Sequence, residues 1–455
     1  MEISYLPNNQ NCKIAIIGLG YVGLPLAIKF ASCKSNVKNG DSLNREIIGF
    51  DLNKERLEQL GENFDKTNEI SAKELMEADI LFTSEESTLE NADVFIVTVP
   101  TPIDEAKKPD LSYIKKASIT IGKSLQFRAK KTNGKYSPII IYESTVYPGA
   151  TEETCVPLIE KYSGLKYNNK NFKEGFFCGY SPERINPGDN INNIDNIVKV
   201  TSGSDQASSN WIDDLYSSVI NAGTFKAKSI IVAEAAKVIE NTQRDINIAL
   251  INELSIIFRK LNISTKDVLE TAETKWNFLK FYPGFVGGHC IGVDPYYLTY
   301  KAQLSGYYPE IITSGRRIND GMGKWVAGEC ILEMAKRGLL IANSRILIMG
   351  FTFKDNCPDI RNTKIINLIK NLENYGANVE VYDPVADKED VKKEYSLDLK
   401  NSFPSKRLYA AIIGAVSHTE FRKYKVERYN SILIENGFCM DFKNFMPEGE
   451  NIIFI

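Results

Sequence analysis

The sequence has few of the residues that build metal centres or disulfide frameworks. Only two of its 455 residues are histidines, His289 and His418, and its eight cysteines are scattered without a CxxC pair. This pattern excludes a disulfide scaffold and argues against a zinc site, so no metal is expected. Cysteine usage of this kind favours a reducing cytoplasm.

No charge of one sign predominates, and long apolar runs are missing. The chain carries 55 lysines and arginines against 58 aspartates and glutamates, and both signs are interspersed. A dedicated surface for nucleic acid or for an anionic membrane is therefore not expected. The N-terminus lacks a basic segment followed by an apolar stretch, and no run approaches the length of a bilayer span. Length and a hydrophobic content of 43% predict a globular protein of two or three domains.

A strand, a glycine turn and a helix follow one another near the N-terminus. The apolar run from Lys13 to Gly18 is followed at once by a helix-like stretch from Leu24 to Ser32. Glycines in the turn let the backbone approach a dinucleotide pyrophosphate, and the helix N-terminus offers free amides. The turn predicts NAD-binding residues, namely Gly18, Gly20, Tyr21, Val22 and Gly23.

A second predicted strand, Glu46 to Phe50, ends in Asp51, whose carboxylate can accept hydrogen bonds from ribose hydroxyls and favours NAD over NADP. The polar stretch 34–45 before it is interpreted as a surface insertion. Alternatively, Asp51 only caps a helix that starts near Asn53. Arg56 is a candidate for a cofactor phosphate, with a solvated helix-face arginine as the alternative.

Hydroxyl groups follow two further predicted strands. The segment 92–102 ends in Thr98 and Thr101, and the segment 139–149 ends in Ser144 and Thr145. Because ligands of open α/β sheets sit at the carboxyl ends of strands, these hydroxyls are expected to face the cofactor. The alternative is that they are ordinary turn residues.

One long helix is predicted over 230–261, a length that suggests a connection between two domains. It contains Lys237 and Asn241, four residues apart and therefore adjacent on one face. Lys237 lies on or next to the apolar stripe, which favours an inward orientation. The stripe consists of Val232, Ala236, Ile239, Ile246, Leu250, Leu254 and Ile257.

The segment 344–384 repeats the strand, helix, strand order without the three-glycine turn, so no second dinucleotide is expected there. Lys354 and Arg361 follow its first strand and suit a diphosphate or a uridine, with surface charge as the alternative. The two units together predict an α/β fold with two Rossmann-like domains joined by the long helix.

Cys290 stands in the most informative segment, FYPGFVGGHCIGVDPYYL, among closely spaced glycines and four residues before Asp294. Glycines leave room for a ligand near the thiol, which predicts a reactive cysteine. The alternative is a small buried hydrophobe in a glycine-rich turn.

Several motifs in order resemble the UDP-glucose/GDP-mannose dehydrogenase family over residues 13–445. They are GLGYVGLPLA (18–27), VPTP (99–102), ESTVYPG (143–149), SPERINPG (181–188), EAAKVIENTQRDINIALINEL (234–254), GGHCIGVDP (287–295) and GFTFKDNCPDIRNT (350–363). Within the family, GGHCIGVDPYYL and the stretch around Lys237 resemble the UDP-N-acetylhexosamine 6-dehydrogenases, whereas UDP-glucose enzymes usually carry another residue at position 289.

The resemblance implies a cytoplasmic enzyme that oxidises a UDP-sugar by four electrons with NAD, for surface polysaccharide precursors. It implies an NAD-binding domain over 1–205, a helical middle region over 206–330 with the cysteine loop and the dimer contact, and a UDP-sugar-binding domain over 331–455. The active site is expected in the cleft between the two α/β domains.

The resemblance also implies residue roles. Cys290 is the expected nucleophile, and Lys237 and Asn241 are expected to stabilise the oxyanion. Asp294 is expected to hold a water, with Glu183 as the base of thioester hydrolysis and Thr145 supporting that water. Cofactor contacts are expected from Asp51, Arg56, Thr101 and Thr145. The expected substrate contacts are Glu183, Arg184, Lys237, Asn241, Tyr282, Gly287, Lys354 and Arg361.

Some alternatives stay open at this point. The nearest is a UDP-glucose 6-dehydrogenase, and the other is a nucleotide-sugar-binding or NAD-sensing protein without catalysis. No role is assigned to His289, and the contributions of Arg316 and Arg317 within or across a dimer are undecided. The choice between the gluco and galacto epimers depends on contacts to one hydroxyl, so the sequence leaves it open.

Overall fold

The computed structural model describes residues 5–67, 69–131, 136–171, 173–185 and 194–455. Two compact units are separated within it. The first comprises residues 1–239 and 296–305, and the second comprises 240–295 and 306–455. The predicted division at 205/206 and 330/331 is a finer one and stays a prediction.

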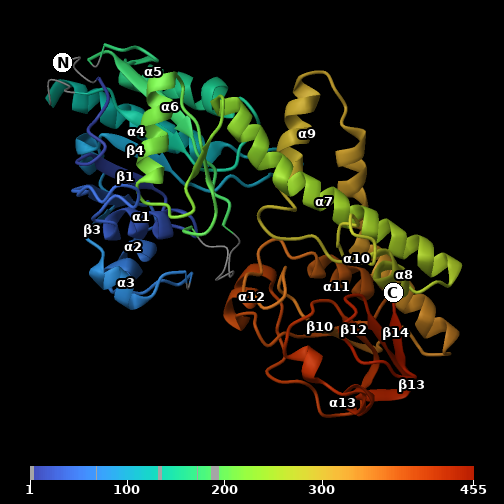
Figure 1. The fold of residues 1–455 in the computed structure, drawn as a ribbon. Coiled ribbons are helices and arrows are strands. Elements are labelled where there is room, and N and C mark those ends of the chain that lie inside the picture. Colours follow the sequence, from blue (N-terminus) through green and yellow to red (C-terminus); the bar gives the residue numbers. More distant parts are fainter. Residues whose placement is uncertain (1–4, 68, 132–135, 172, 186–193) are drawn as a thin grey trace. The chain divides into compact units, whose positions relative to one another are not determined.

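The first unit is built on a parallel sheet in the order β3-β2-β1-β4-β5-β7-β6 (Figure 1). Its central strands are continuous apolar runs, as expected for parallel strands that are covered on both faces. The strands are β1 (Lys13–Ile17), β2 (Glu46–Phe50), β3 (Ile80–Thr83), β4 (Val94–Val97), β5 (Ile139–Tyr142), β6 (Lys166–Tyr167) and β7 (Gly175–Tyr180). A separate pair is formed by β8 (Lys199–Thr201) and β9 (Thr224–Lys226).

Helices cover both faces of this sheet. Phe30 of α1 and Tyr216 of α6 belong to the apolar core on the face of Ile141. Ser118 of α4 bonds to the hydroxyl of Tyr142, which points to the opposite face because side chains alternate along a strand. The helices of this region are α1 (Gly23–Ser32), α2 (Lys54–Gly61), α3 (Ala72–Glu77), α4 (Ser112–Lys131), α5 (Val156–Ser163) and α6 (Gln206–Ser217).

The second unit contains a parallel sheet in the order β11-β10-β12-β13-β14. Helices α10 and α11 pack on one face, and an aromatic cluster around Phe421, Tyr424 and Tyr429 packs on the other. Its strands are β10 (Arg345–Met349), β11 (Asn378–Tyr382), β12 (Tyr409–Gly414), β13 (Leu433–Asp441) and β14 (Ile452–Phe454). The remaining helices are α7 (Ile230–Leu261), α8 (Thr265–Ala272), α9 (Asp294–Leu304), α10 (Glu310–Lys336), α11 (Ile365–Asn374), α12 (Lys388–Tyr395) and α13 (Val426–Asn430).

The predicted fold class is confirmed: two parallel, Rossmann-like sheets are joined along the chain by one long helix. Helix α7 has the predicted bounds, and residues 240–261 of it belong to the second unit. The stretch 34–45 is mostly exposed, as expected for a surface insertion, although Leu43 and Arg45 are buried. In the part of the chain that is described, no helix is long and apolar enough to cross a membrane.

Candidate active site

The glycine turn between β1 and α1 forms an open cradle. Gly18 donates its backbone N–H to the carbonyl of Phe50 at 2.8 Å and has a φ of +99°, a conformation that favours glycine. A Cβ added to Gly20 would meet no atom within 4 Å, whereas one on Gly23 would stand 1.8 Å from the carbonyl oxygen of Gly18. The open space at Gly20 and the N-terminus of α1 therefore fit a dinucleotide pyrophosphate.

Alanine is expected to have different effects at these two glycines. In Gly23→Ala the new methyl group collides with a backbone carbonyl, so we expect the free energy of unfolding to fall by about 1–3 kcal/mol and NAD binding to be lost. In Gly20→Ala the methyl group enters the cradle, so stability stays near native while the Kd for NAD rises about tenfold or more. Denaturant unfolding and NAD titration measure both effects, and equal unfolding midpoints would contradict the steric argument.

Asp51 lies at the end of β2, beside the cradle. Its carboxylate accepts the backbone N–H groups of Leu19 at 2.8 Å and of Asn53 at 2.9 Å. The alternative that Asp51 only caps the next helix is wrong, because Asn53 is the N-cap of α2 and accepts the N–H of Arg56. The carboxylate is thus fixed against the glycine turn, where a ribose would follow the pyrophosphate.

Arg56 is buried, so the alternative of a solvated helix-face arginine is wrong. Its Nε donates to the carbonyl of Leu19 at 2.9 Å, and its guanidinium pairs with Asp65 at 2.8 Å. These contacts tie α2 to the glycine turn. Its contact with the cofactor stays a prediction.

The hydroxyls at the ends of β4 and β5 divide into two groups. Thr98 and Ser144 are buried, and they donate to the carbonyls of Gly18 at 2.7 Å and of Val99 at 2.6 Å. Thr98 thereby contacts the glycine turn and Ser144 contacts the end of β4, and their contact with the cofactor stays a prediction. Thr101 donates to the carbonyl of Thr145 at 2.6 Å, and both threonines are half-buried.

Glu183 follows β7 and is held by the backbone. One of its carboxylate oxygens accepts the N–H groups of Arg184 and Ile185, both at 2.6 Å. Its other oxygen lies 3.4 Å from the ammonium group of Lys199. The guanidinium of Arg184 donates to the carbonyl of Val198 at 3.0 Å. Sequence reasoning missed Lys199, because only the fold brings β8 to Glu183.

Helix α7 buries a polar face. Lys237 and Asn241 are only 7% and 6% exposed, so the inward orientation of Lys237 is confirmed. The reason given for this orientation was that Lys237 lies on or next to an apolar stripe. That reason is wrong, because Val232, Ile239 and other large side chains of the stripe are exposed. Helix α7 thus buries Lys237 and Asn241, while several of its large apolar side chains are exposed.

Glu234 fixes α7 against the loop after β5. Its carboxylate is buried and accepts the N–H groups of Gly149 at 2.5 Å and of Thr151 at 2.9 Å. Burial raises the pKa of Glu234 to about 7, although these hydrogen bonds act to lower it. Since Lys237 lies one helical turn further along, Glu234 sets its position relative to Thr145.

The cysteine loop presents Cys290 to solvent. Cys290 is exposed, so the alternative of a small buried hydrophobe is wrong. The other cysteines are buried except Cys33, and burial raises the pKa of Cys155 and Cys330 to about 12. The carbonyl of Cys290 accepts the N–H of Asp294 at 2.8 Å, which places the thiol just before α9.

Within the second unit, two predicted catalytic residues lie together. The side-chain amide of Asn241 donates to the carboxylate of Asp294 at 2.6 Å, and both residues are buried. Asp294 is also tied to Cys290 through the backbone. The contact fixes α7 to the start of α9 beside the thiol.

The glycines before Cys290 make room for protein rather than for a ligand. A Cβ on Gly287 would stand 2.7 Å from the carbonyl oxygen of Asn362, and one on Gly288 would stand 2.8 Å from the ring of Phe353. The expectation that these glycines leave space above the thiol is therefore wrong. They let the cysteine loop pack against the segment 350–363.

His289 of the cysteine loop lies near Arg361 of the segment 350–363. Burial and, next, the charge of Arg361 lower the pKa of His289 to about 4, so its ring is neutral at pH 7. Arg361 makes a two-pronged contact with buried Asp359, at 2.8 and 2.5 Å. Arg316 is also buried and pairs with Asp245 and Asp320 at 2.6 Å each.

The remaining predicted substrate residues are accessible. Tyr282 is exposed, as is Arg317, and Lys354 is half-buried. Their contacts with a substrate stay predictions.

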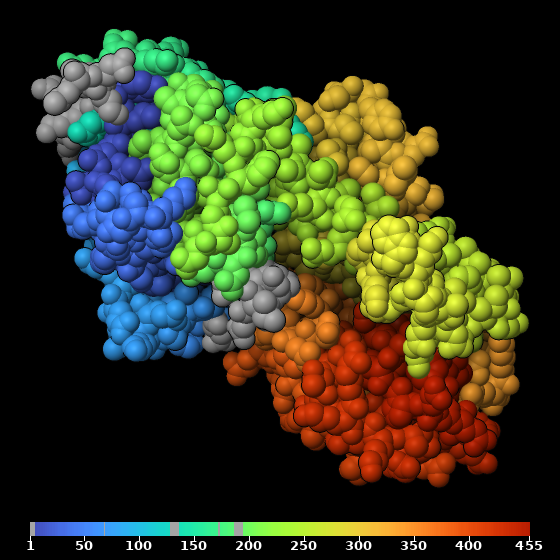
Figure 2. Space-filling view, in the orientation of Figure 1, coloured from blue at the N-terminus to red at the C-terminus, as the bar shows by residue number. Residues whose placement is uncertain are grey.

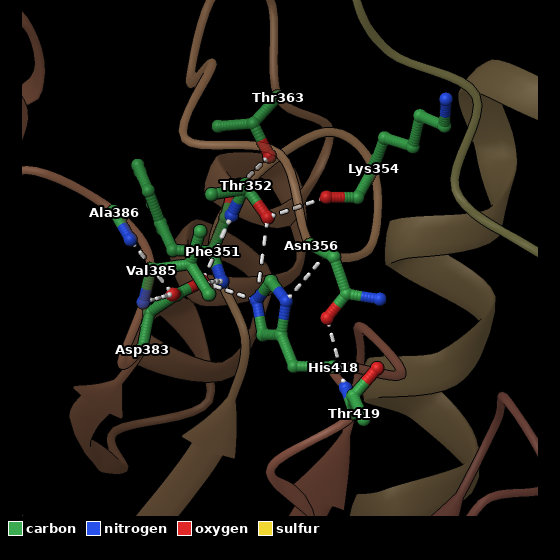
Figure 3. A network of polar contacts seen from close by, with 10 residues as sticks. All are labelled: Phe351, Thr352, Lys354, Asn356, Thr363, Asp383, Val385, Ala386, His418 and Thr419. Atoms are coloured by element: carbon green, nitrogen blue, oxygen red, sulfur yellow. Dashed lines mark hydrogen bonds and ion pairs between the residues drawn. The ribbon is translucent and has the colours of Figure 1, made fainter. Parts of the chain in front are cut away.

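The turn after β10 repeats the plan of the glycine turn, with one difference (Figure 3). Asp383 ends β11 and accepts the N–H of Phe351 at 2.6 Å, as Asp51 accepts the N–H of Leu19. Here, however, His418 Nε2 lies 3.0 Å from the same carboxylate. Backbone hydrogen bonds and His418 oppose the effect of burial and hold the pKa of Asp383 at about 2.

His418 also fixes the loop that carries Lys354. Its Nδ1 accepts the N–H of Asn356 at 2.9 Å, which leaves Nε2 as the nitrogen that donates toward Asp383. The hydroxyl of Thr352 donates to the carbonyl of Lys354 at 2.8 Å, while the side chain of Lys354 extends away from the network (Figure 3). Loop and lysine are thereby held in place.

A dinucleotide cradle with a carboxylate beside it, on one of two Rossmann-like sheets, is the plan of an NAD-dependent dehydrogenase. Three family models match the chain. The NAD-binding domain of the UDP-glucose/GDP-mannose dehydrogenase family matches residues 12–220, its central domain 231–321 and its UDP-binding domain 347–448. The chain belongs to the UDP-glucose/GDP-mannose dehydrogenase family, whose members are NAD-dependent nucleotide-sugar dehydrogenases.

Individual relatives span nearly the whole chain. A UDP-N-acetyl-D-glucosamine 6-dehydrogenase of Pseudomonas aeruginosa is 50% identical over 443 residues, covering 97% of this chain and 99% of that protein. Protein CapL of Staphylococcus aureus is 48% identical over 441 residues, covering 97% and 98%. The solved structure of a UDP-D-ManNAc dehydrogenase from Pyrococcus horikoshii has a TM-score of 0.82 at 27% identity, covering 97% and 98%. These relatives argue against the non-catalytic alternative.

Proposed function

We propose that this protein oxidises the C6 hydroxymethyl group of a UDP-N-acetylhexosamine, UDP-GlcNAc or UDP-GalNAc, to a carboxylate for surface polysaccharide synthesis. The observation that carries the proposal is the exposed thiol of Cys290 beside the buried pair of Asn241 and Asp294. Relatives at about half identity act, by their names, on UDP-N-acetyl-D-glucosamine. A cytoplasmic location stays a prediction.

The first oxidation converts the hydroxymethyl group to an aldehyde. NAD held at the glycine turn of Gly18, Gly20 and Gly23 would supply the hydride acceptor for both oxidations at C6. Lys237, buried on α7, stabilises the negative charge that develops on the sugar oxygen. Asn241 orients Asp294 through its amide, and the water that Asp294 holds takes the proton of the sugar hydroxyl.

The second oxidation needs the thiol, because an aldehyde is a poor hydride donor. The Cys290 thiolate adds to the aldehyde carbon and forms a hemithioacetal, which gives up the second hydride and becomes a thioester. Glu183 takes a proton from water, water displaces the sulfur, and the products are the carboxylate and the free thiol. Thr145 supports that water. In sum, the hydroxymethyl group and one water give the carboxylate, while two NAD are reduced to two NADH and three protons are released.

Product stoichiometry and substrate preference test this function. Purified protein is incubated with NAD and, separately, UDP-GlcNAc, UDP-GalNAc and UDP-glucose, and NADH and sugar acid are both quantified. We expect about two NADH for each acid formed, with an N-acetylated sugar preferred. Preference for UDP-glucose would overturn the substrate assignment, and one NADH for each sugar would overturn the thioester route.

We also propose that the protein is a homodimer joined along α7. The exposed stripe on this helix includes Ile239, Leu250 and Ile257, and Trp276, after α8, is 92% exposed. The segment that contains α7 runs along the visible surface (Figure 2). Exposed apolar side chains repeated along one helix favour an interface, and a second copy offers the matching stripe across a two-fold axis.

Charged residues on this stripe are expected to separate the dimer. In Ile239→Glu/Leu250→Glu, two carboxylates would have to be buried without partners, so the molar mass should fall to that of one 51.2 kDa chain. Light scattering after size exclusion measures it. Val37→Glu, at an exposed apolar residue outside α7, is the control and should leave the mass unchanged. A double variant that stays dimeric would contradict this interface.

A further inference from the structure

Lys199 is a buried lysine shared by two carboxylates. It is the first residue of β8, and its ammonium group lies 2.7 Å from Glu143 and 3.4 Å from Glu183. Glu143 directly follows β5 and its side chain is fully buried, whereas Glu183 retains some exposure. The lysine therefore connects a carboxylate in the interior to the carboxylate that is proposed to activate water.

The other oxygens of the two carboxylates also have partners. Glu143 accepts the hydroxyl of Tyr216 on α6, and Glu183 accepts the backbone amides of residues 184 and 185. Lys199 also lies over the ring of Tyr216, 5.3 Å from its centre. The guanidinium of Arg184 is directed to a backbone carbonyl. Lys199 is in hydrogen-bond contact with both carboxylates, and the charge of Glu183 acts on Glu143.

The ammonium group of Lys199 is the counter-ion of two carboxylates, Glu143 and Glu183. Burial acts to lower the pKa of Lys199, but Glu143 and Glu183 raise it above its usual value, so the lysine is charged at neutral pH. Burial raises the pKa of Glu143, with Lys199 opposing. Because Glu143 is closer to the ammonium group, the electrostatic attraction between Lys199 and Glu143 is stronger than that between Lys199 and Glu183.

We propose that Lys199 is a positioning residue that holds the Glu183 carboxylate in place and sets its basicity, with Glu143 as the competing anion. The proposal deepens the function above and rests on Glu183 as the base of thioester hydrolysis. If Glu183 were the only carboxylate paired with Lys199, the full charge of the lysine would make Glu183 a weak base. With Glu143 as a second partner of the lysine, Glu183 is expected to accept a proton from water more readily than it would as the sole partner.

Two variants are expected to move the pH dependence of hydrolysis in opposite directions. In Glu143→Gln the whole charge of Lys199 acts on Glu183, so the acid limb of the hydrolysis rate should move to lower pH. In Lys199→Met/Glu143→Gln both charges are absent and no buried carboxylate is left unpaired, so the limb should move to higher pH by about one unit. The measurement is single-turnover release of sugar acid from the thioester across pH.

A merely structural role would lower the rate without moving the limb. Unchanged limbs in both variants, or shifts in the same direction, would overturn the role of Lys199. If the double variant does not fold, the expected shift of the acid limb to lower pH in Glu143→Gln tests the proposal by itself. Glu183→Gln tests the role of Glu183 separately from that of Lys199. If this variant retains hydrolysis, Glu183 is not the base. If it loses hydrolysis while the acid limbs of the other variants do not move, only the role of Lys199 is overturned.

Discussion

Replacing Cys290 by alanine is expected to reduce formation of the sugar acid by about 10⁴-fold or more, because loss of a nucleophile removes the covalent route entirely. The residue is exposed four residues before the start of α9, so its removal leaves no cavity in the core. NAD binding should be unchanged, since the glycine cradle lies on β1 and α1. Sugar acid and NADH are measured over a complete time course.

The control for this variant is Cys33→Ala. Cys33 is the one other cysteine that is not fully buried, and its thiol lies near the backbone carbonyls of Ser35 and Ser218. Its removal should leave the rate near native, which separates loss of the nucleophile from loss of any thiol. Sugar acid formed by Cys290→Ala at a rate comparable to the native protein would mean that hydrolysis does not pass through a thioester.

Replacing Lys237 by methionine is expected to slow the first hydride transfer by about 10²–10³-fold, the usual cost of removing one oxyanion donor. One N–H of Asn241 is already engaged with Asp294, so Lys237 supplies the positive charge. Methionine keeps the volume of the buried stem, so stability should change little. Stopped-flow NADH formation and the Kd for NAD together measure the effect, which should fall on the rate alone.

Lys260→Met is the matched control, because Lys260 lies on the same helix but is exposed near its C-terminal end. It should keep the native rate. Lys237→Arg retains the charge in a wider, planar group and is expected to recover only part of the rate. If Lys237→Met turned over at the native rate, the sugar oxygen would have to be stabilised by another group.

The local elements were predictable because their causes lie close together in the sequence. The strand, glycine turn and helix from Lys13 to Ser32 follow from an apolar run, three glycines and a helical pattern, and α7 has its predicted bounds. The repeated unit around β10, α11 and β11 was equally visible. Each depends on residues within a few turns of one another.

Orientation and pairing were not predictable in the same way. The stripe on α7 was expected to face inward, yet the helix buries Lys237 and exposes Ile239. A hydrophobic pattern identifies two faces but does not say which one meets the core, because a partner subunit satisfies the apolar face equally well. The surroundings of Gly287 and Gly288 were not predictable from the sequence either. Only the fold shows that Phe353 occupies the space where their side chains would be.

The sequence alone therefore determined the family, the cofactor and the type of both sheets, and it pointed to Cys290 and Lys237. The tertiary structure decided which charges are buried and what they contact. Lys199 meets Glu143 across 56 residues, and Glu234 meets Gly149 across 85. Such pairs leave no periodic signal, because burial and hydrogen bonding in the folded chain, rather than spacing along it, bring their atoms together.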